Sequence, residues 1–161
     1  MCDGQVEQMA AAAELYRRPA TNFVASFVGG INWVHGHLER GRVVTDLGAE
    51  MSYQSASLAA ARGERFEIGI RPEALHVQPR AASSVDGADA AAEAWTPGRV
   101  LRRATRGHFD EVLVDTPLGE LRGYVDPALA LGAEVAVRAS EVLIYSGGKL
   151  LTDEAVPAEM A

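Results

Sequence analysis

The sequence of 161 residues has one cysteine, few aromatic residues and no long hydrophobic run. Cys2 has no second cysteine with which to form an internal disulfide, so we expect a reduced, cytoplasmic setting. No apolar stretch approaches the roughly 20 residues that a membrane-spanning helix needs, and the N-terminus lacks the pattern of a signal peptide. Aromatic residues make up only 6% of the chain, which predicts a core built from Val, Leu and Ile.

Positive charge is also scarce. The chain has 15 Lys and Arg against 22 Asp and Glu, a formal net charge of −7. Nucleic-acid binding depends on clustered cations that neutralise phosphates, so we expect no nucleic-acid partner. A Gly-rich phosphate loop ending in Gly-Lys-Ser/Thr is missing, because the one Gly-Lys pair, Gly148-Lys149, is followed by Leu150. We therefore expect no ATP hydrolysis, no cofactor and no enzymatic activity.

The first 30 residues predict helices. Residues 10–20 are rich in alanine and should form a helix that Pro19 ends. In the next short helix, the apolar side chains fall on one stripe that Gly29 terminates; they are Phe23, Val24, Phe27 and Val28.

From Asn32 onward the hydrophobic period changes to two, as in β-strands. The predicted strands cover residues 33–38, 42–47, 65–71, 75–78, 99–104, 110–116, 119–125, 134–139 and 142–145, with a hairpin turn at 115–119. Residues 51–63 should hold one strand and one short helix, and the low-complexity residues 81–94 a flexible loop. The predicted fold is mainly β: tandem OB-like barrels at 31–80 and 95–161, preceded by a helical segment at 1–30.

Two stretches carry a family resemblance. Residues 14–29 read ELYRRPATNFVASFVG and residues 69–73 read GIRPE. They resemble E-L-Y-x-x-P-x-N-x-F-V-A-x-F-I-G and G-x-R-P-E in the ATP-binding subunits of bacterial ABC importers for sugars, glycerol phosphate, polyamines and iron. The resemblance implies a C-terminal TOBE regulatory domain, also called MOP-like, with an OB fold. The Leu-Ser-Gly-Gly-Gln signature and the apolar run ending in Asp-Glu are absent, so the ATPase domain is not expected here.

The sequence departs from the family pattern before the first helix. Residues 3–8 are similar to the last hairpin strand of the ATPase domain, but Ala10, Ala11 and Ala12 replace the Gly-Thr-Pro that follows it in the family. The loss of a side-chain cap is worth about 1 kcal/mol, and alanine should let the helix extend backward.

Arg71-Pro72-Glu73 predicts a rigid corner at the end of a strand, because proline fixes φ and biases the preceding residue towards extended geometry. The corner suits an Arg–carboxylate contact, within the barrel or across to a neighbouring domain, and an internal strut is an equal alternative. We assign Arg71, Pro72 and Glu73 to an interface and regulatory set, together with Asn32 and the apolar stripe.

The basic residues Arg99, Arg102 and Arg103 form, with Arg106, a candidate anion site. Against it, Arg99 and Arg102 should point to opposite faces of a regular strand, and Asp110 and Glu111 are expected ion-pair partners.

The histidines give a weaker pattern. His35, His37 and Glu39 alternate on one strand face, which favours a solvated polar face over a metal site, so no metal is assigned. His76 and His108 are isolated in the sequence.

These observations favour a non-catalytic regulatory and dimerisation domain. We expect a homodimer that pairs through the apolar stripe and contacts ATPase or permease subunits of an ABC transporter at the inner face of the membrane. The alternative is a small-ligand module that binds an oxyanion such as molybdate, or a sugar. Single-stranded nucleic-acid binding is disfavoured because it needs aromatic platforms on a basic groove.

Overall fold

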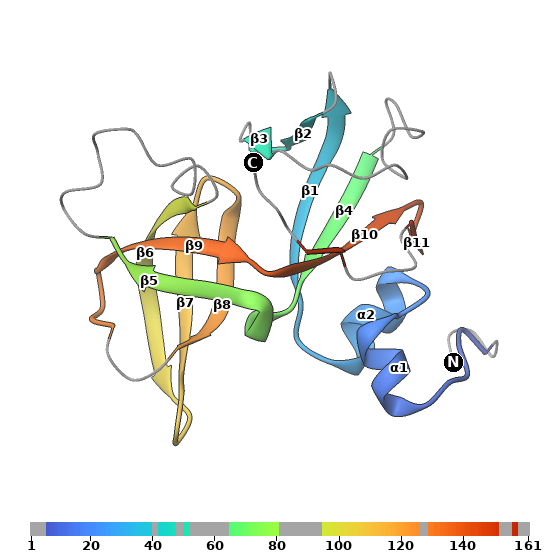
Figure 1. The fold of residues 1–161 in the computed structure, drawn as a ribbon, viewed down its shortest axis with the longest axis horizontal. Coiled ribbons are helices and arrows are strands. Elements are labelled where there is room, and N and C mark those ends of the chain that lie inside the picture. The colour runs from blue at the N-terminus through green and yellow to red at the C-terminus, as the bar shows by residue number, and fades with distance from the viewer. Residues whose placement is uncertain are drawn as a thin grey trace.

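The computed structural model describes residues 6–39, 42–47, 50–51, 65–80, 95–125, 129–151 and 156–157. Two curled β-sheets lie side by side, and two short helices pack against one of them (Figure 1). The helices are α1 (Ala12–Arg17), α2 (Asn22–Val28) and a 3₁₀ turn, Pro72–Ala74. The strands are β1 (Asn32–Glu39), β2 (Arg42–Thr45), β3 (Glu50–Met51), β4 (Arg65–Ile70), β5 (Leu75–Pro79), β6 (Thr96–Thr105), β7 (Asp110–Thr116), β8 (Gly119–Val125), β9 (Glu134–Ala139), β10 (Glu141–Ser146), β11 (Lys149–Leu150) and β12 (Val156–Pro157).

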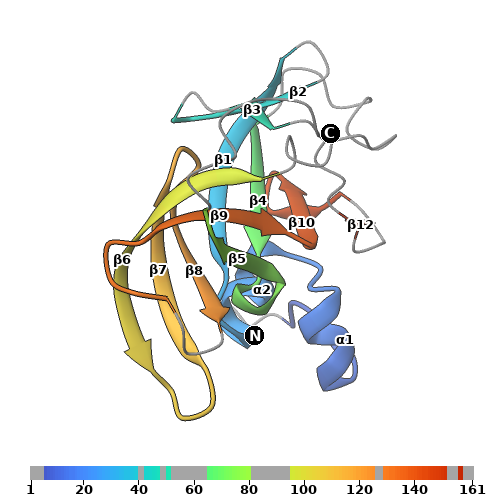
Figure 2. The ribbon, with the colours of Figure 1, turned by 60° about the vertical axis from the view of Figure 1, so that its left-hand side comes forward.

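The two sheets exchange strands. The first has the order β11-β10-β4-β1-β2-β3, with β12 also paired to β10, and the second has the order β5-β9-β6-β7-β8. β5 comes from the first half of the chain but lies in the second sheet, and β10 comes from the second half but lies in the first (Figures 1 and 2). The mainly β, OB-like fold is confirmed, but the sheets do not divide where the two sequence halves do.

One continuous core joins the sheets. Along β9, Val135, Val137 and Ala139 are buried and the residues between them are not, as the alternating pattern predicts. The same cluster includes Phe66 and Ile68 of β4. The second sheet curls until β8 lies against β5: a Cβ at Gly123 would lie 3.2 Å from side-chain carbons of Leu75 and Val77.

The hairpin between β7 and β8 is confirmed. The Thr116 hydroxyl donates to the carbonyl of Gly119 (2.7 Å) and accepts from the amide of Leu118 (3.1 Å). Gly119 has φ of 107°, in the region that favours glycine. The turn chemistry therefore sets the register of the two strands.

The helical segment begins differently from its prediction. α1 starts at Ala12 after an extended Ala11 that makes no side-chain cap, so the expected backward extension is wrong. Gln8 holds the preceding chain instead, because its side chain accepts from the Ala20 amide (2.8 Å) and donates to the Arg18 carbonyl (3.1 Å). Residues 6–8 form no strand, and residues 1–5 lie outside the described residues.

Other predictions fall wholly or partly outside the described residues. They include the loop at 81–94 and most of residues 51–63, of which only the end of β3 is described. Among the described residues, no helix has the length and apolar character needed to span a membrane.

Candidate interaction site at the junction of the two sheets

The chain passes between the sheets twice, and the two crossings touch. The first crossing is the turn 71–74, and the second is Ser140, between β9 and β10. The amide and hydroxyl of Ser140 both donate to the carbonyl of Ala74, at 2.8 and 3.2 Å. Pro72 is buried at the start of the 3₁₀ turn, and Arg71 is extended, as a residue before proline should be. The rigid corner is therefore present, and it joins the two sheets.

Arg71 fastens the helical segment to this corner. Its guanidinium is buried and donates to four backbone carbonyls: Ala25 (3.1 Å), Gly29 (3.3 Å), Gly30 (3.3 Å) and Tyr16 (3.1 Å). It also lies 4.2 Å from the centroid of the Tyr16 ring, within cation–π range. The cation meets the C-terminal end of α2, where the helix dipole is negative. No carboxylate pairs with Arg71 among the described residues, and its contacts are those of an internal strut.

Tyr16 links α1 to the same corner. Its hydroxyl donates a hydrogen bond to the Glu73 carboxylate. Burial, followed by this hydrogen bond and the charge of Glu73, raises the pKa of Tyr16 to about 12. Glu73 is therefore hydrogen-bonded to the Tyr16 hydroxyl, whereas Arg71 is hydrogen-bonded to backbone carbonyls. The exposed Glu73 and the buried Arg71 of the motif both hold the helical segment.

Tyr145 adds a contact from β10. This side chain is fully buried, and its hydroxyl donates to the carbonyl of Pro19 (3.1 Å). Burial raises the pKa of Tyr145 above its ordinary value. Trp33 packs edge-on against it, with ring centroids 5.5 Å apart, and donates through its indole to the Ser26 hydroxyl (3.2 Å). The helical segment is therefore held by β10 and β1 as well as by the corner.

Asn32 ties the first sheet to the second. Its side-chain amide donates to the carbonyls of Ile70 (3.1 Å) and Arg122 (2.8 Å), and its oxygen accepts from the Arg122 amide (2.7 Å). A side chain of β1 thereby satisfies both backbone groups of one residue on the end strand β8, as a neighbouring strand would. Asn32 is buried, and the contacts that its side chain makes join the two sheets of this chain.

The apolar stripe of α2 is divided between core and surface. Val24 is buried, at 7% exposure, and Val28 is partly buried, so Val24 does not offer the predicted surface. Phe23 and Phe27 are exposed, Phe27 at 80%, and their rings stack with centroids 6.2 Å apart. The helix is only seven residues long and its buried side faces the first sheet, which is why one stripe cannot lie wholly on the surface.

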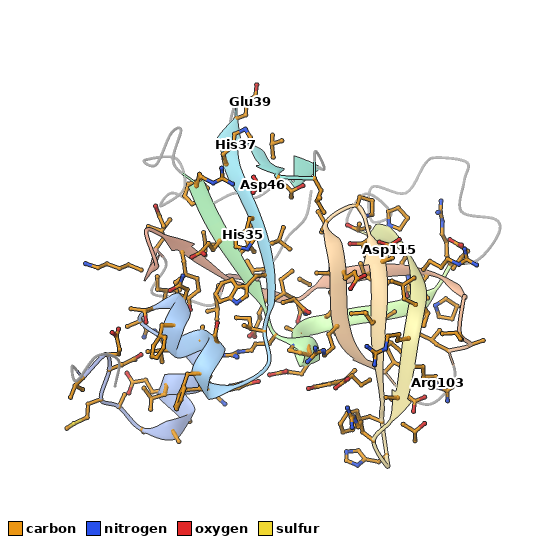
Figure 3. The ribbon with its side chains drawn as sticks, turned by 180° about the vertical axis from the view of Figure 1, so that it is seen from behind. His35, His37, Glu39, Asp46, Arg103 and Asp115 are labelled. Carbon is orange, nitrogen blue, oxygen red and sulfur yellow. The ribbon has the colours of Figure 1, made fainter. Side chains whose placement is uncertain are left out.

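The structure does not bring the candidate anion residues together. Arg103 pairs with the fully buried Asp110 at 2.5 Å and donates to the Leu129 carbonyl at 3.0 Å. A β-bulge between Val100 and Arg102 shifts the register of β6 on β7. Arg99 therefore lies opposite the exposed Asp115, on the sheet face of Arg102, so the expectation of opposite faces is wrong. Figure 3 places Arg103 and Asp115 towards opposite ends of this sheet.

The expected ion-pair partners are confirmed, since Arg106 also pairs with Glu111 at 3.4 Å. Arg103 is thus neutralised, and its carboxylate partner retains one buried oxygen, Oδ1, without a partner among the described residues. Of the other two candidate arginines, Arg99 lies opposite Asp115 and Arg102 lies opposite Leu113 on the neighbouring strand β7.

His35 and His37 lie on the outer face of β1 (Figure 3). His35 lies 4.0 Å from Glu67, and His37 lies 4.0 Å from Glu39, all partly or well exposed. No group of three or more His, Cys, Asp or Glu side chains suited to a metal occurs in the described part of the chain. The arrangement is that of a polar strand face.

A small cleft of about 80 Å³ opens beside the corner, next to Arg71. Segments far apart in the sequence line it; the lining residues are Tyr16, Arg17, Gly69, Arg71, Glu73, Ala74, Glu141, Val142 and Leu143. Sequence reasoning did not single out Tyr16, Ser140 or Glu141 as site residues. A signal for Tyr16 exists, because an aromatic ring can stabilise an arginine by a cation–π contact, and Tyr16 lies in one of the two stretches that carry the family resemblance. Nothing in the sequence places Glu141 beside α1.

The comparisons with known proteins agree with the fold. No family model matches the chain. Among solved structures, it is similar to the cytoplasmic molybdate-binding protein ModG, with a TM-score of 0.54 and 18% identity, over 70% of this chain and 94% of that one. The similarity defines the class of fold, an OB-like β domain.

Several curated proteins are similar over about half of the chain. The sulfate/thiosulfate import ATP-binding protein CysA 2 of Chromobacterium violaceum is 38% identical over 81 residues, which is 48% of this chain and 20% of that protein. The sn-glycerol-3-phosphate import ATP-binding protein UgpC of Burkholderia mallei is 36% identical over 83 residues, 47% of this chain and 23% of that protein. CysA of Bordetella pertussis is 36% identical over 84 residues, 52% of this chain and 23% of that protein.

The chain thus spans less than a quarter of the length of these relatives. The matches fall in the C-terminal regions of ABC importer ATP-binding subunits. Together with the OB-like fold, these matches support the TOBE-like domain that the ELY and RPE motifs predict.

Proposed function

We propose that this chain is a non-catalytic regulatory and dimerisation domain that acts with subunits of an ABC importer. The partial match to ATP-binding subunits, confined to their C-terminal regions, supports a role beside an ATPase rather than as one. On this proposal the domain works at the cytoplasmic face of the membrane, and it reaches the membrane only through transporter subunits.

The exposed Phe23–Phe27 stack carries the dimerisation part of the proposal. Two phenylalanine rings on adjacent turns of α2 form an apolar patch, and a ring that is 80% exposed is disfavoured in water. A second copy can cover the patch by two-fold symmetry, so that each Phe27 packs on its equivalent. The patch belongs to the helical segment that Arg71 and Tyr16 hold against the sheet junction, so dimerisation through the patch would also affect the contacts at the junction.

Sedimentation equilibrium tests this proposal. We expect a dimer for the unaltered chain and a monomer for Phe27→Ser. The matched control is Leu131→Ser, because Leu131 is also well exposed, at 68%, but lies at the second sheet. A monomeric unaltered chain at high micromolar concentration, or an equal loss of association in both variants, would contradict dimerisation through α2. A phosphate-release assay with ATP should give no signal above that of a heat-denatured sample.

A second candidate function is favoured by the structural similarity to a molybdate-binding protein. In this alternative the domain binds a small oxyanion or a sugar. Of the four arginines of the candidate anion site, Arg103 is paired with Asp110 and Arg106 with Glu111. Calorimetry with molybdate, tungstate, sulfate and common sugars tests the alternative, and a saturable heat with any of them would favour it.

A further inference from the structure

The outer face of the second sheet carries two exposed arginines on either side of a leucine. The register of β6, β7 and β8 places Arg102, Leu113 and Arg122 in one row across the three strands, on one face. Both arginines are exposed, and neither side chain makes an ion pair with the described part of the chain. Neighbouring strands lie about 4.8 Å apart, so the two arginine Cα atoms are about 10 Å apart, and both side chains can reach one anionic group above Leu113.

The β-bulge of β6 creates this row. Val100 pairs with Val114, so a regular strand would place Leu101 opposite Leu113. The extra residue places Arg102 there instead, as bulges commonly do where a side chain is redirected. The second cation of the row therefore depends on the irregularity of the strand.

The next row, nearer the β7–β8 hairpin, is acidic. It holds Arg99, Asp115 and Glu120, so one positive side chain lies beside two negative ones. A single-stranded nucleic acid would have to place phosphates over this row as well as over the arginines. Repulsion from the two carboxylates therefore restricts an anion to the single row of Arg102 and Arg122.

The row on the other side, nearer the β6–β7 turn, offers an aromatic surface. It holds Ala104, Glu111 and Tyr124, and Glu111 already pairs with Arg106 at 3.4 Å. Tyr124 is 38% exposed and packs against Phe109, with ring centroids 4.9 Å apart. A ring held in this way suits contact with an apolar side chain.

We propose that this face binds an extended segment of a partner protein in which an acidic residue lies two positions from a basic residue on one side and two positions from an apolar residue on the other. Rows of the sheet are about 6.8 Å apart, which is the spacing of alternate residues in an extended peptide. The acidic side chain accepts hydrogen bonds from Arg102 and Arg122. The basic side chain faces Asp115 and Glu120, and the apolar one packs on Tyr124. This assignment rests on the proposed protein-interaction function and names the chemistry of the partner.

Titration of the full, ¹⁵N-labelled chain with the peptide acetyl-Lys-Gly-Glu-Gly-Phe-amide, followed by nuclear magnetic resonance, tests the proposal. We expect saturable shifts of the Leu113 and Tyr124 backbone amides, and weaker binding at higher salt because the arginines are exposed. The matched peptide, acetyl-Glu-Gly-Lys-Gly-Phe-amide, has the same composition but places its lysine over the arginines, so it should bind more weakly.

Variants of the two arginines test the row directly. Arg102→Gln and Arg122→Gln should each weaken binding of the first peptide by about fivefold, the effect of one exposed ion pair. Arg122→Gln keeps the backbone groups that Asn32 binds, so the fold should persist. Arg80→Gln is the matched control, because it removes the same charge from an exposed residue at the end of β5, and it should leave binding unchanged.

Three results with the peptides would overturn the proposal: shifts that do not saturate, equal binding of the two peptides, or an affinity that neither arginine variant changes. Tighter binding of oligothymidylate than of the first peptide would also overturn it, in favour of a nucleic acid. Sedimentation of the Phe27→Ser variant does not depend on these probes. A failure of this proposal is therefore distinguishable from a failure of dimerisation through α2.

Discussion

Replacement of Arg71 by methionine should release the helical segment from the sheet junction. The change keeps a long unbranched side chain but leaves four carbonyls, at 3.1 to 3.3 Å from the guanidinium, without their donor. A hydrogen bond from a charged donor contributes about 1.5–3 kcal/mol, and the cation–π contact with Tyr16 about 1 kcal/mol more. These terms are not additive, because water reaches the carbonyls once the segment moves.

We therefore expect Arg71→Met to lower the free energy of unfolding by about 3–4 kcal/mol, the range for removal of one partner from a buried charged network. Arg71→Lys should recover only part of this loss, because a point charge cannot reach carbonyls on two sides as a planar fork does. Arg65→Met is the matched control: its side chain is 78% exposed and makes one ion pair, with Asp46 at 2.6 Å, so the loss should stay within about 1 kcal/mol.

Urea denaturation followed by tryptophan fluorescence measures these changes, and the two tryptophans report different regions. Trp33 contacts Ser26 of α2, whereas Trp95 lies beneath Arg138 of the second sheet. Trp33 should respond first in Arg71→Met, and the α2 amides should exchange hydrogen faster. If Arg71→Met unfolds within about 1 kcal/mol of the unaltered chain and α2 exchange is unchanged, the strut reasoning is refuted.

Three further perturbations follow from the same contacts. Asn32→Leu leaves both backbone groups of Arg122 unpaired and should cost about 2–4 kcal/mol in thermal or urea unfolding; a loss below about 1 kcal/mol would contradict the tie between the sheets. Arg103→Ala should destabilise the chain by about 1–2 kcal/mol more than Asp110→Ala. The first change leaves the fully buried Asp110 without its partner, whereas the second leaves Arg103, whose side chain is 35% exposed and can reach water. Equal losses in the two variants would contradict this reasoning. The pKa of Tyr16 is about 12 in the folded state and 10.0 in the unfolded chain. The contribution of this shift to the free energy of unfolding is therefore complete below pH 10 and is lost as the pH rises from about 10 to about 12. Tyr16→Phe should reduce the fall in urea midpoint between about pH 9 and pH 11, and an unchanged fall would argue against Tyr16 as its source.

Most strands could be predicted from the sequence because local alternation reports burial directly. The segments at 110–116, 119–125 and 134–139 coincide with β7, β8 and β9. Pairing is a different matter, since β10 joins β4 across more than 70 residues of sequence and no local pattern specifies that partner. The bulge near Leu101 could not be predicted for a related reason. One extra residue moves every side chain before it to the other face of the sheet, and charged residues at exposed positions do not indicate where such a residue lies.

The site was predictable in part. Arg71-Pro72-Glu73 could be recognised as a rigid corner because proline restricts both itself and its neighbour. The hydrogen-bond partners of Arg71 could not be predicted, because they are backbone carbonyls in and next to α1 and α2. Every residue has a backbone carbonyl, so the sequence does not indicate which ones accept from Arg71. The apolar stripe predicted the helix but not which side of it faces the sheet, so Val24 was assigned to the surface although its side chain is buried. Periodicity identifies an apolar face; tertiary packing decides how much of that face is covered.

The exchange of β5 and β10 makes neither half of the chain self-sufficient. A break between β5 and β6 would produce one fragment with β4 unpaired on the side that β10 occupies, and another with β9 unpaired on the side of β5. Each fragment would present an open strand edge whose natural complement is the other fragment, so the two pieces should reassemble when mixed and aggregate when kept apart. The two sheets are therefore not separate modules in tandem: each completes the other, and the domain must be transferred, truncated or fused as one unit.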